Sequence, residues 1–185
     1  MTDAELRAAI RDVAYLEGDF VLRSGKRSKY YLDKYRFETQ PELLRALGVR
    51  IAAAVAELEP EADRLAGPEL GAIPLAAAAS LEAGLPFLLV RKEAKDYSTA
   101  KRIEGVVEEG DRVCLVEDVV TTGGALLAAV EALREAGLTC ETAVCVVDRE
   151  EGGEEELARQ GIRLRRLFTA AEILAAGKSA ANPHG

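Results

Sequence analysis

Two adjacent carboxylates, Glu117 and Asp118, stand shortly before a small polar turn, Thr121–Gly124. The apolar run Val113–Val116 leads into them and predicts a buried strand. After the turn, apolar side chains recur with helical spacing at Leu126, Leu127, Val130 and Leu133. A strand, a loop and a helix in this order place the loop at the carboxyl edge of a parallel sheet, where open α/β folds bind ligands.

The turn has the composition of a phosphate site. Its glycines, Gly123 and Gly124, let the backbone approach a ligand closely, and the hydroxyls of Thr121 and Thr122 add hydrogen-bond donors. The first N–H groups of the following helix have no partners within the helix, and they carry the positive end of its dipole. This arrangement favours a bound phosphate.

The two carboxylates indicate what accompanies the phosphate. They would repel a phosphate, but they can accept hydrogen bonds from a diol or hold a divalent cation, directly or through water. A phosphate beside a sugar diol is the chemistry of a ribose 5-phosphate. The alternative is an ordinary strand-to-helix turn with an acidic cap, and the combination of two carboxylates with Thr-Thr-Gly-Gly favours the phosphate site.

Composition restricts the class of protein. The 185 residues predict one domain, and 49% hydrophobic with 30% charged residues is typical of a globular protein. No apolar run reaches membrane-spanning length, and the first residues are polar and acidic rather than signal-like. We therefore expect a cytoplasmic protein that has no membrane partner.

Histidine and cysteine usage argues against several chemistries. The one histidine, His184, makes Ser-His-Asp, Cys-His and multi-histidine metal sites poor hypotheses. Cys114 and Cys145 fall inside apolar strand patterns, which predicts buried reduced thiols. Any divalent ion must therefore be held by oxygen atoms.

Charge distribution indicates the kind of ligand. The formal net charge of −8 and a pI of about 4.9 argue against extended nucleic-acid binding. Two basic stretches, 23–36 and 91–102, stand out against this acidic background. With a phosphate loop in the same chain, they suggest a small polyanionic ligand.

Strand and helix patterns alternate along the chain, which predicts an α/β fold with a central parallel sheet. We expect residues 1–185 to form a single domain, residues 1–36 to form a small cap, and residues 93–110 to form a long active-site loop. The expected helices cover 2–16, 41–58, 75–81, 126–136, 154–159 and 170–175, and the expected strands cover 20–22, 30–35, 65–66, 87–90, 113–116, 142–147 and 162–168.

The stretch Val113–Ala125 closely resembles the phosphoribosyl-diphosphate motif of the type I phosphoribosyltransferases. That motif consists of apolar residues, two acidic residues, two apolar residues and a loop rich in Thr and Gly. Three further segments resemble orotate phosphoribosyltransferases: Phe20–Lys34 their N-terminal segment, Arg91–Gly105 their flexible loop, and Asp148-Arg149 the segment that presents an arginine to orotate. The resemblance covers nearly the whole chain.

The resemblance implies a type I phosphoribosyltransferase-like sheet flanked by helices, with an N-terminal hood and a flexible loop. It implies transfer of ribose 5-phosphate from 5-phosphoribosyl 1-diphosphate (PRPP) to orotate, with Mg²⁺, giving orotidine 5′-monophosphate and pyrophosphate. It also implies a homodimer with shared active sites, in which the flexible loop reaches the neighbouring subunit.

Site residues follow from the same resemblance, with Lys95 and Asp118 as the catalytic pair. Lys95 would lie closest to the leaving pyrophosphate. Orotate would be bound by Tyr31, Thr121 and Arg149, and the metal by Glu117 and Asp118 through water, together with the diphosphate. The residues that would bind PRPP are Arg23, Arg91, Lys92, Lys95, Glu117, Asp118, Val119, Val120, Thr121, Thr122, Gly123, Gly124 and Ala125.

Three departures from the family pattern stand in the sequence. Gly71 replaces a lysine of many bacterial members, Tyr97 replaces a frequent histidine, and Leu32 replaces an aromatic residue. Two alternative functions stay open: a phosphoribosyltransferase for another base, and a nucleotide-sensing regulator on the same fold. Arg149 and the Arg23–Lys34 segment argue against the first, and the absence of a visible DNA-binding segment argues against the second.

Overall fold

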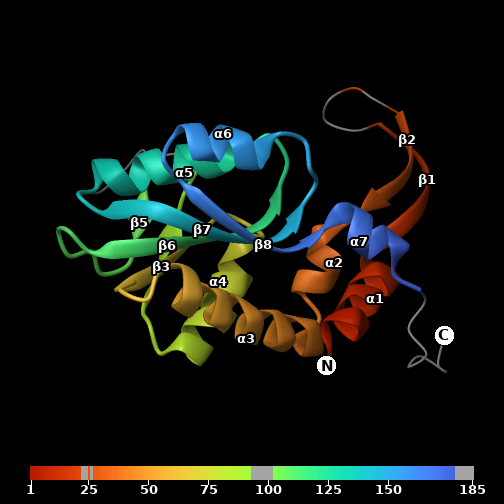
Figure 1. Ribbon diagram of the computed structural model, residues 1–185, viewed down its shortest axis with the longest axis horizontal. Helices are drawn as coiled ribbons and strands as arrows, with labels where there is room; N and C mark the ends of the chain where they lie inside the picture. The colour runs from red at the N-terminus through yellow and green to blue at the C-terminus, as the bar shows by residue number, and fades with distance from the viewer. Residues whose placement is uncertain (22–24, 26, 93–101, 178–185) are drawn as a thin grey trace.

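A six-stranded sheet forms the centre of the molecule, and a two-stranded hairpin near the N-terminus stands apart from it (Figure 1). The computed structural model describes residues 1–21, 25, 27–92 and 102–177. Arg23, Lys95, Tyr97 and most of the expected flexible loop therefore lie outside the described residues. Within the described part, no helix is both long enough and apolar enough to cross a membrane.

The sheet has the strand order β5-β4-β3-β6-β7-β8. All strands are parallel except β5, which pairs antiparallel with β4 at one edge. The central strands are nearly continuous apolar runs because helices cover both faces of the sheet. The strand bounds are β3 Arg64–Pro68, β4 Phe87–Val90, β5 Ile103–Glu104, β6 Arg112–Val120, β7 Thr139–Asp148 and β8 Arg163–Thr169.

Helices cover both faces of the sheet (Figure 1). Helices α3 (Pro41–Leu58) and α4 (Ala72–Ala83) lie on one face, and α5 (Gly124–Glu135) and α6 (Gly153–Arg159) lie on the other. Each face has its own cluster of buried apolar side chains, so the sheet separates two cores. With tryptophan absent and alanine abundant, these cores depend on close backbone approach.

The N-terminal part packs against the end of this sandwich. Helix α1 (Asp3–Ala14) begins at a capping box formed by Thr2 and Glu5, and strands β1 (Tyr15–Val21) and β2 (Arg27–Leu32) form the antiparallel hairpin. Helix α2 (Lys34–Glu38) follows the hairpin, and α7 (Ala170–Ala175) lies beside α1. Arg7 Nη1 of α1 lies 3.3 Å from Glu172 Oε1 of α7.

The α/β prediction with a parallel sheet is confirmed, and three local predictions are wrong. The first helix ends at Ala14 instead of continuing through Leu16, because Tyr15 and Leu16 pair with β2. The predicted strand 30–35 ends at Leu32, because the Asp33 carboxylate accepts a hydrogen bond from the backbone N–H of Tyr35 and starts α2. The predicted loop 93–110 contains the short edge strand β5.

Candidate functional site

Loops that follow four neighbouring parallel strands meet at the carboxyl edge of the sheet. They follow β4, β3, β6 and β7, and they carry Lys92, Gly71, Thr121 and Arg149 respectively. Since parallel strands end at the same edge, residues far apart in the sequence become neighbours there.

The predicted acidic pair lies inside the end of β6 and is buried. Glu117 is 7% exposed and Asp118 is 1% exposed, and β6 continues past both of them to Val120. The backbone N–H of Asp118 donates to Glu117 Oε1 at 3.1 Å, and the backbone N–H of Val119 donates to Asp118 Oδ1 at 2.5 Å. Burial, followed by the charge of Asp118, raises the pKa of Glu117 to about 8.

Two residues of α2 complete this acidic group, and the sequence reasoning missed both as site residues. Lys34 Nζ lies 2.6 Å from Asp118 Oδ2. Glu38, one helical turn further on, is 2% exposed, and its Oε1 has no hydrogen-bond partner among the described residues. Burial, followed by the charge of Asp118, raises the pKa of Glu38 to about 8. Burial lowers the pKa of Lys34, but its hydrogen bond to Asp118 and the nearby carboxylates outweigh burial and raise it overall.

The predicted phosphate loop has the backbone that its sequence requires. Gly123 caps helix α5 with a φ of 85°, a left-handed conformation that favours glycine, and its carbonyl accepts from Leu127 N at 2.9 Å. Gly124 and Ala125 are exposed, so the first turn of α5 is open to a ligand. Helix α6 supports the loop closely, because a Cβ on Gly153 would lie 2.5 Å from the carbonyl oxygen of Thr121.

Two cations, Arg91 and Lys92, lie at the end of β4, which is separated from β6 by β3. The backbone N–H of Lys92 donates to Glu69 Oε1 at 2.6 Å, and Glu69 N donates to the carbonyl of Val90 at 2.8 Å. These contacts place Arg91 and Lys92 beside the loop that follows β3. The loop itself contains a cis peptide bond between Glu69 and Leu70.

Arg149 follows β7 and lies next to the phosphate loop. Its backbone N–H donates to the carbonyl of Val120 at 2.9 Å, and its side chain, 31% exposed, reaches Glu151 Oε1 at 3.1 Å. The partner of the guanidinium, Glu151, has a side chain that is 44% exposed. A planar anion could replace that partner, since Arg offers a fork of donors.

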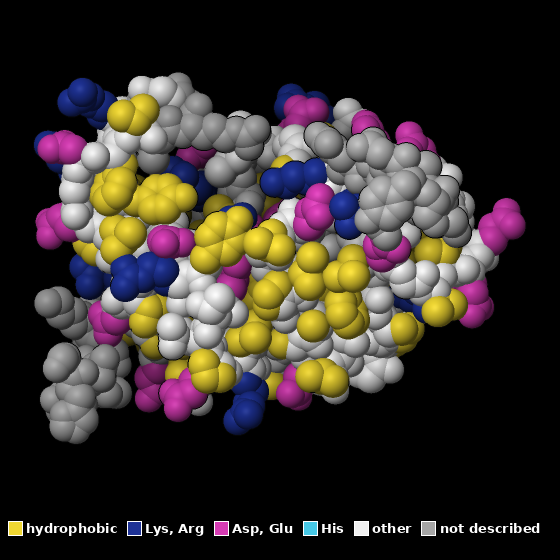
Figure 2. Space-filling model, turned by 180° about the vertical axis from the view of Figure 1, so that it is seen from behind, with side chains coloured by type: hydrophobic (Ala, Val, Ile, Leu, Met, Phe, Trp, Pro, Cys, Tyr) yellow, Lys and Arg dark blue, Asp and Glu magenta, His cyan; other side chains and the backbone are white. Residues whose placement is uncertain are grey.

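Tyr31 projects from β2 of the hairpin and is 41% exposed. Its ring centroid lies 5.7 Å from that of Phe20, at a tilt of 35°. Figure 2 shows the surface hollowed between the hairpin side of the molecule and the main body, with Lys and Arg side chains beside the hollow. An aromatic face on the hairpin is therefore available to a flat ligand.

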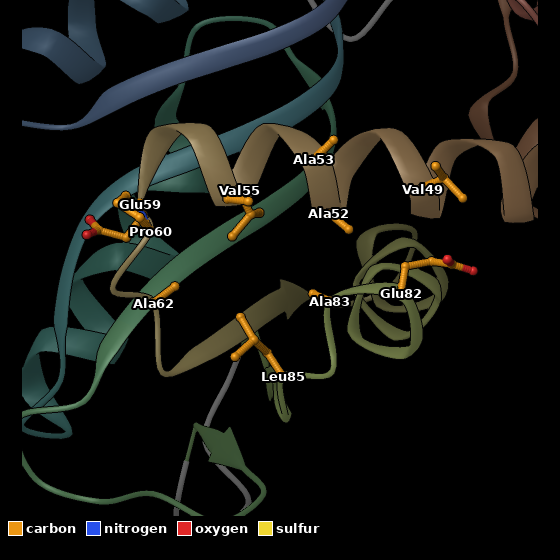
Figure 3. A pocket seen from close by; sticks show the side chains of 11 residues that line it. Val49, Ala52, Ala53, Val55, Glu59, Pro60, Ala62, Glu82, Ala83 and Leu85 are labelled. Atoms are coloured by element: carbon orange, nitrogen blue, oxygen red, sulfur yellow. The ribbon is translucent and has the colours of Figure 1, made fainter.

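A separate apolar groove lies away from this edge (Figure 3). It has a volume of about 470 Å³ and lies between α3, the end of α4 and the segments that lead into β3 and β4. Because those segments precede the strands, the groove is at the amino ends of β3 and β4. Its lining is mainly Ala, Val and Leu with Glu59 and Glu82, which does not suit an anionic ligand.

Comparisons with known proteins agree with the geometry of the edge. The family model of the phosphoribosyl transferase domain matches residues 36–162. An orotate phosphoribosyltransferase of Methanocella arvoryzae is 49% identical over 173 residues, which are 93% of this chain and 97% of that protein. The crystal structure of orotate phosphoribosyltransferase from Aeropyrum pernix has a TM-score of 0.80 at 36% identity and covers 94% of this chain and 96% of its own.

One further solved structure carries a ligand. The crystal structure of Mycobacterium tuberculosis orotate phosphoribosyltransferase in complex with PRPP has a TM-score of 0.78 at 30% identity, and the match covers 92% of this chain and 98% of that chain. The resemblance inferred from the motifs is confirmed by these matches. The chain belongs to the phosphoribosyltransferase family and, within it, to the orotate phosphoribosyltransferases.

Proposed function

We infer that this protein transfers ribose 5-phosphate from PRPP to orotate, giving orotidine 5′-monophosphate and pyrophosphate in pyrimidine nucleotide synthesis. One observation carries the inference: a phosphate loop, a buried acidic pair and an arginine meet at one sheet edge, in a chain whose relatives have this name. The reaction needs little covalent help from the protein. Carbon 1 of the ribose gains positive character as pyrophosphate leaves, so alignment and charge stabilisation supply the catalysis.

We propose that the donor occupies the end of β6 and the start of α5. The loop from Val119 to Ala125 would hold the 5-phosphate with backbone N–H groups and threonine hydroxyls. Glu117 and Asp118 would accept hydrogen bonds from the ribose hydroxyls. Arg91 and Lys92 lie at the end of β4, with β3 between β4 and β6, and they would neutralise the pyrophosphate together with Arg23 and Lys95 from outside the described residues.

Orotate would bind between the phosphate loop and the hairpin. The Arg149 guanidinium would exchange Glu151 for the orotate carboxylate, and the Thr121 hydroxyl would bond the ring. Tyr31 would stack on the ring from the hairpin side. Because the Arg149 guanidinium would pair with a carboxylate on the base, this site would favour orotate over a base that has no carboxylate.

We propose Mg²⁺ as the cofactor, held mainly by the diphosphate. Among the described residues, no group of three or more His, Cys, Asp or Glu side chains could hold a metal ion alone. Glu117 and Asp118 fit an outer role, because their oxygens can receive hydrogen bonds from metal-bound water. When bound, the ion would supply positive charge to the leaving group.

We further propose a cytoplasmic homodimer built from single phosphoribosyltransferase domains, each with residues 1–36 as a hood. Exposed apolar side chains on α3 and α4, among them Val49 and Leu81, offer a surface for a second copy. Three free buried cysteines fit a reducing compartment. The net charge of −8 disfavours nucleic acid as a partner.

Incubation with PRPP, Mg²⁺ and a panel of bases tests the activity directly. Orotate should release pyrophosphate, and adenine, hypoxanthine and uracil should not. Release with an uncharged base and none with orotate would overturn the proposal.

The variant Arg149→Ala tests the recognition of the carboxylate. It should raise the orotate KM by about 10- to 100-fold, because a hydrogen bond to a charged group contributes about 1.5–3 kcal/mol. The PRPP KM should change little. Arg165→Ala is the matched control, since Arg165 is an exposed arginine that contacts Glu57 of α3 at 3.5 Å. Unchanged orotate kinetics in Arg149→Ala would remove this residue from the site.

A further inference from the structure

Lys34 lies outside the sequence motif of the donor site, yet its ammonium group contacts the carboxylate at the centre of that motif. The distance from Nζ to Asp118 Oδ2 is 2.6 Å, and the two side chains are 33% and 2% exposed. We propose that Lys34 is a positioning residue for PRPP: it orients Asp118 toward the ribose hydroxyls and offsets the negative charge of this buried carboxylate. This inference rests on the proposed function and names one more residue of that site.

Orientation of Asp118 is the first step. Oδ1 accepts the backbone N–H of Val119, and Oδ2 accepts the Lys34 ammonium. A carboxylate has about four lone-pair positions, so these contacts fix its plane and leave acceptor capacity for a diol. Without Lys34, one of the two contacts that fix the carboxylate is lost, and the side chain can rotate.

Charge is the second step. The carboxyl groups of Glu38, Glu117 and Asp118 all lie at this point, and all three are buried. A donor with a phosphate and a diphosphate brings further negative charge to the same edge. Within the described ranges, Lys34 is the cation that forms an ion pair with Asp118, so its removal leaves a buried carboxylate without a charge partner.

The loop after β3 explains why this cation comes from the N-terminal part. A Cβ on Gly71 would lie 2.1 Å from Asp118 Oδ2 and 2.8 Å from Glu38 Oε2. The backbone of that loop is therefore too close to the carboxyl groups for a side chain to pass between them. Lys34 reaches Asp118 from α2 instead.

Helix α2 holds Lys34 in place for this contact. The Asp33 carboxylate caps its start through Tyr35 N at 3.2 Å, and Phe37 is buried in the core beneath it. The Lys34 ammonium also lies 5.4 Å from the centre of the Tyr35 ring. The contact is therefore built into the fold and links the hood to the end of β6.

Three variants at this position, with a control, test the proposal in steady-state kinetics and in PRPP titration calorimetry. Lys34→Met removes the charge and keeps the length, Lys34→Gln keeps an N–H donor without charge, and Lys34→Arg keeps the charge. The control is Arg50→Met, because Arg50 Nε contacts Asp3 at 2.7 Å and joins α3 to α1 away from the site.

Lys34→Met and Lys34→Gln should each raise the PRPP KM and Kd by about tenfold or more, with the orotate KM within about threefold. Lys34→Arg should restore most of the PRPP affinity, and Arg50→Met should lower the Tm without affecting PRPP. Normal PRPP affinity in the uncharged variants overturns the proposal. An equal loss of affinity for PRPP and orotate that Lys34→Arg does not restore also overturns the proposal, because it identifies a purely structural ion pair. A wild-type enzyme inactive on orotate would instead contradict the proposed function.

Discussion

At the scale of single residues, Glu117 and Asp118 show how the proposed binding site would oppose folding stability. Burial of a carboxylate costs free energy, and the raised pKa of Glu117 reports that cost. Backbone N–H groups and Lys34 compensate part of it. The rest of this cost remains. In return, the carboxyl oxygens are shielded from water at the place where the ribose hydroxyls would bind, so water would not compete with the ribose for them.

The cysteines are the opposite case, since nothing in the proposed chemistry uses them. Cys114, Cys140 and Cys145 are fully buried, and burial raises the pKa of Cys114 and of Cys140 from about 9 to about 12. A thiol disulfide reagent at pH 8 should therefore leave the native protein unlabelled for many minutes, because the thiolate is the reactive form. The same reagent in guanidinium chloride should label all three.

The sign of the pH dependence follows from these raised values. Between pH 9 and pH 12 the unfolded thiols lose protons that the folded ones retain, so stability falls as pH rises through this range. Serine at Cys114, which cannot ionise there, should reduce the slope of the unfolding free energy against pH. In the labelling experiment, rapid reaction of any thiol of the native protein at pH 8 would show that the cysteine side chains are not fully buried in solution.

At the scale of elements, the contact between α3 and α4 depends on one missing side chain. A Cβ on Gly48 would lie 2.9 Å from the backbone carbon and the Cβ of Ala78. Alanine normally stabilises a helix interior by about 1 kcal/mol over glycine, but here it would force the helices apart. We expect Gly48→Ala to lower the free energy of unfolding by about 1–3 kcal/mol in a urea titration.

The exposed position Ala53 on the same helix supplies the control. Ala53→Gly should lower the free energy of unfolding by about 1 kcal/mol, as this exchange usually does in a helix interior. If Gly48→Ala stabilises the protein instead, α3 and α4 can move apart without a cost in free energy. The close approach of the two helices then does not contribute to stability.

The sequence predicts these elements to different degrees. Helix α3 and strands β6 and β7 are long and strongly patterned, so both their type and their approximate position were predicted. Helix α2 has five residues, too few for a periodicity, and the predicted strand 30–35 overlaps its first two residues. The end of α1 was also missed, since Tyr15 and Leu16 continue its apolar pattern and pairing with β2 decides their conformation.

The site divides in the same way. The acidic pair and the phosphate loop form one continuous stretch, so the sequence alone predicts them. The contact between Lys34 and Asp118 joins residues 84 positions apart, and no local pattern reports such a contact. The basic stretch 23–36 contained a signal for Lys34, but only the fold distinguishes it from its basic neighbours. Nothing in the sequence marks Glu38.

At the scale of the whole molecule, the described cations of the proposed donor site come from different parts of the chain. Lys34 comes from the N-terminal part, and Arg91 and Lys92 come from the end of β4. The family resemblance adds Lys95, which lies outside the described residues, and implies that it acts in the neighbouring subunit. A two-fold dimer would then contain two equivalent sites, each built from both chains.

Subunit mixing tests that assembly. Lys95→Ala and Asp118→Asn should each be nearly inactive alone, because each damages both sites of its own homodimer. In a mixed dimer, the Lys95→Ala subunit keeps its Asp118 and receives Lys95 from its partner, which gives one intact site beside one doubly damaged site. Random reassortment makes about half of the dimers mixed, so activity should return to about a quarter of wild type.

The two variants must be unfolded and refolded together, or co-expressed, so that subunits exchange. The same proteins mixed without exchange are the control and should remain inactive. A recovery that rises with the measured fraction of mixed dimers supports a shared site, because neither parent can supply it. If mixed dimers are present and activity stays at the level of the parents, Lys95 acts within its own subunit, and the second copy contributes no residue to the site.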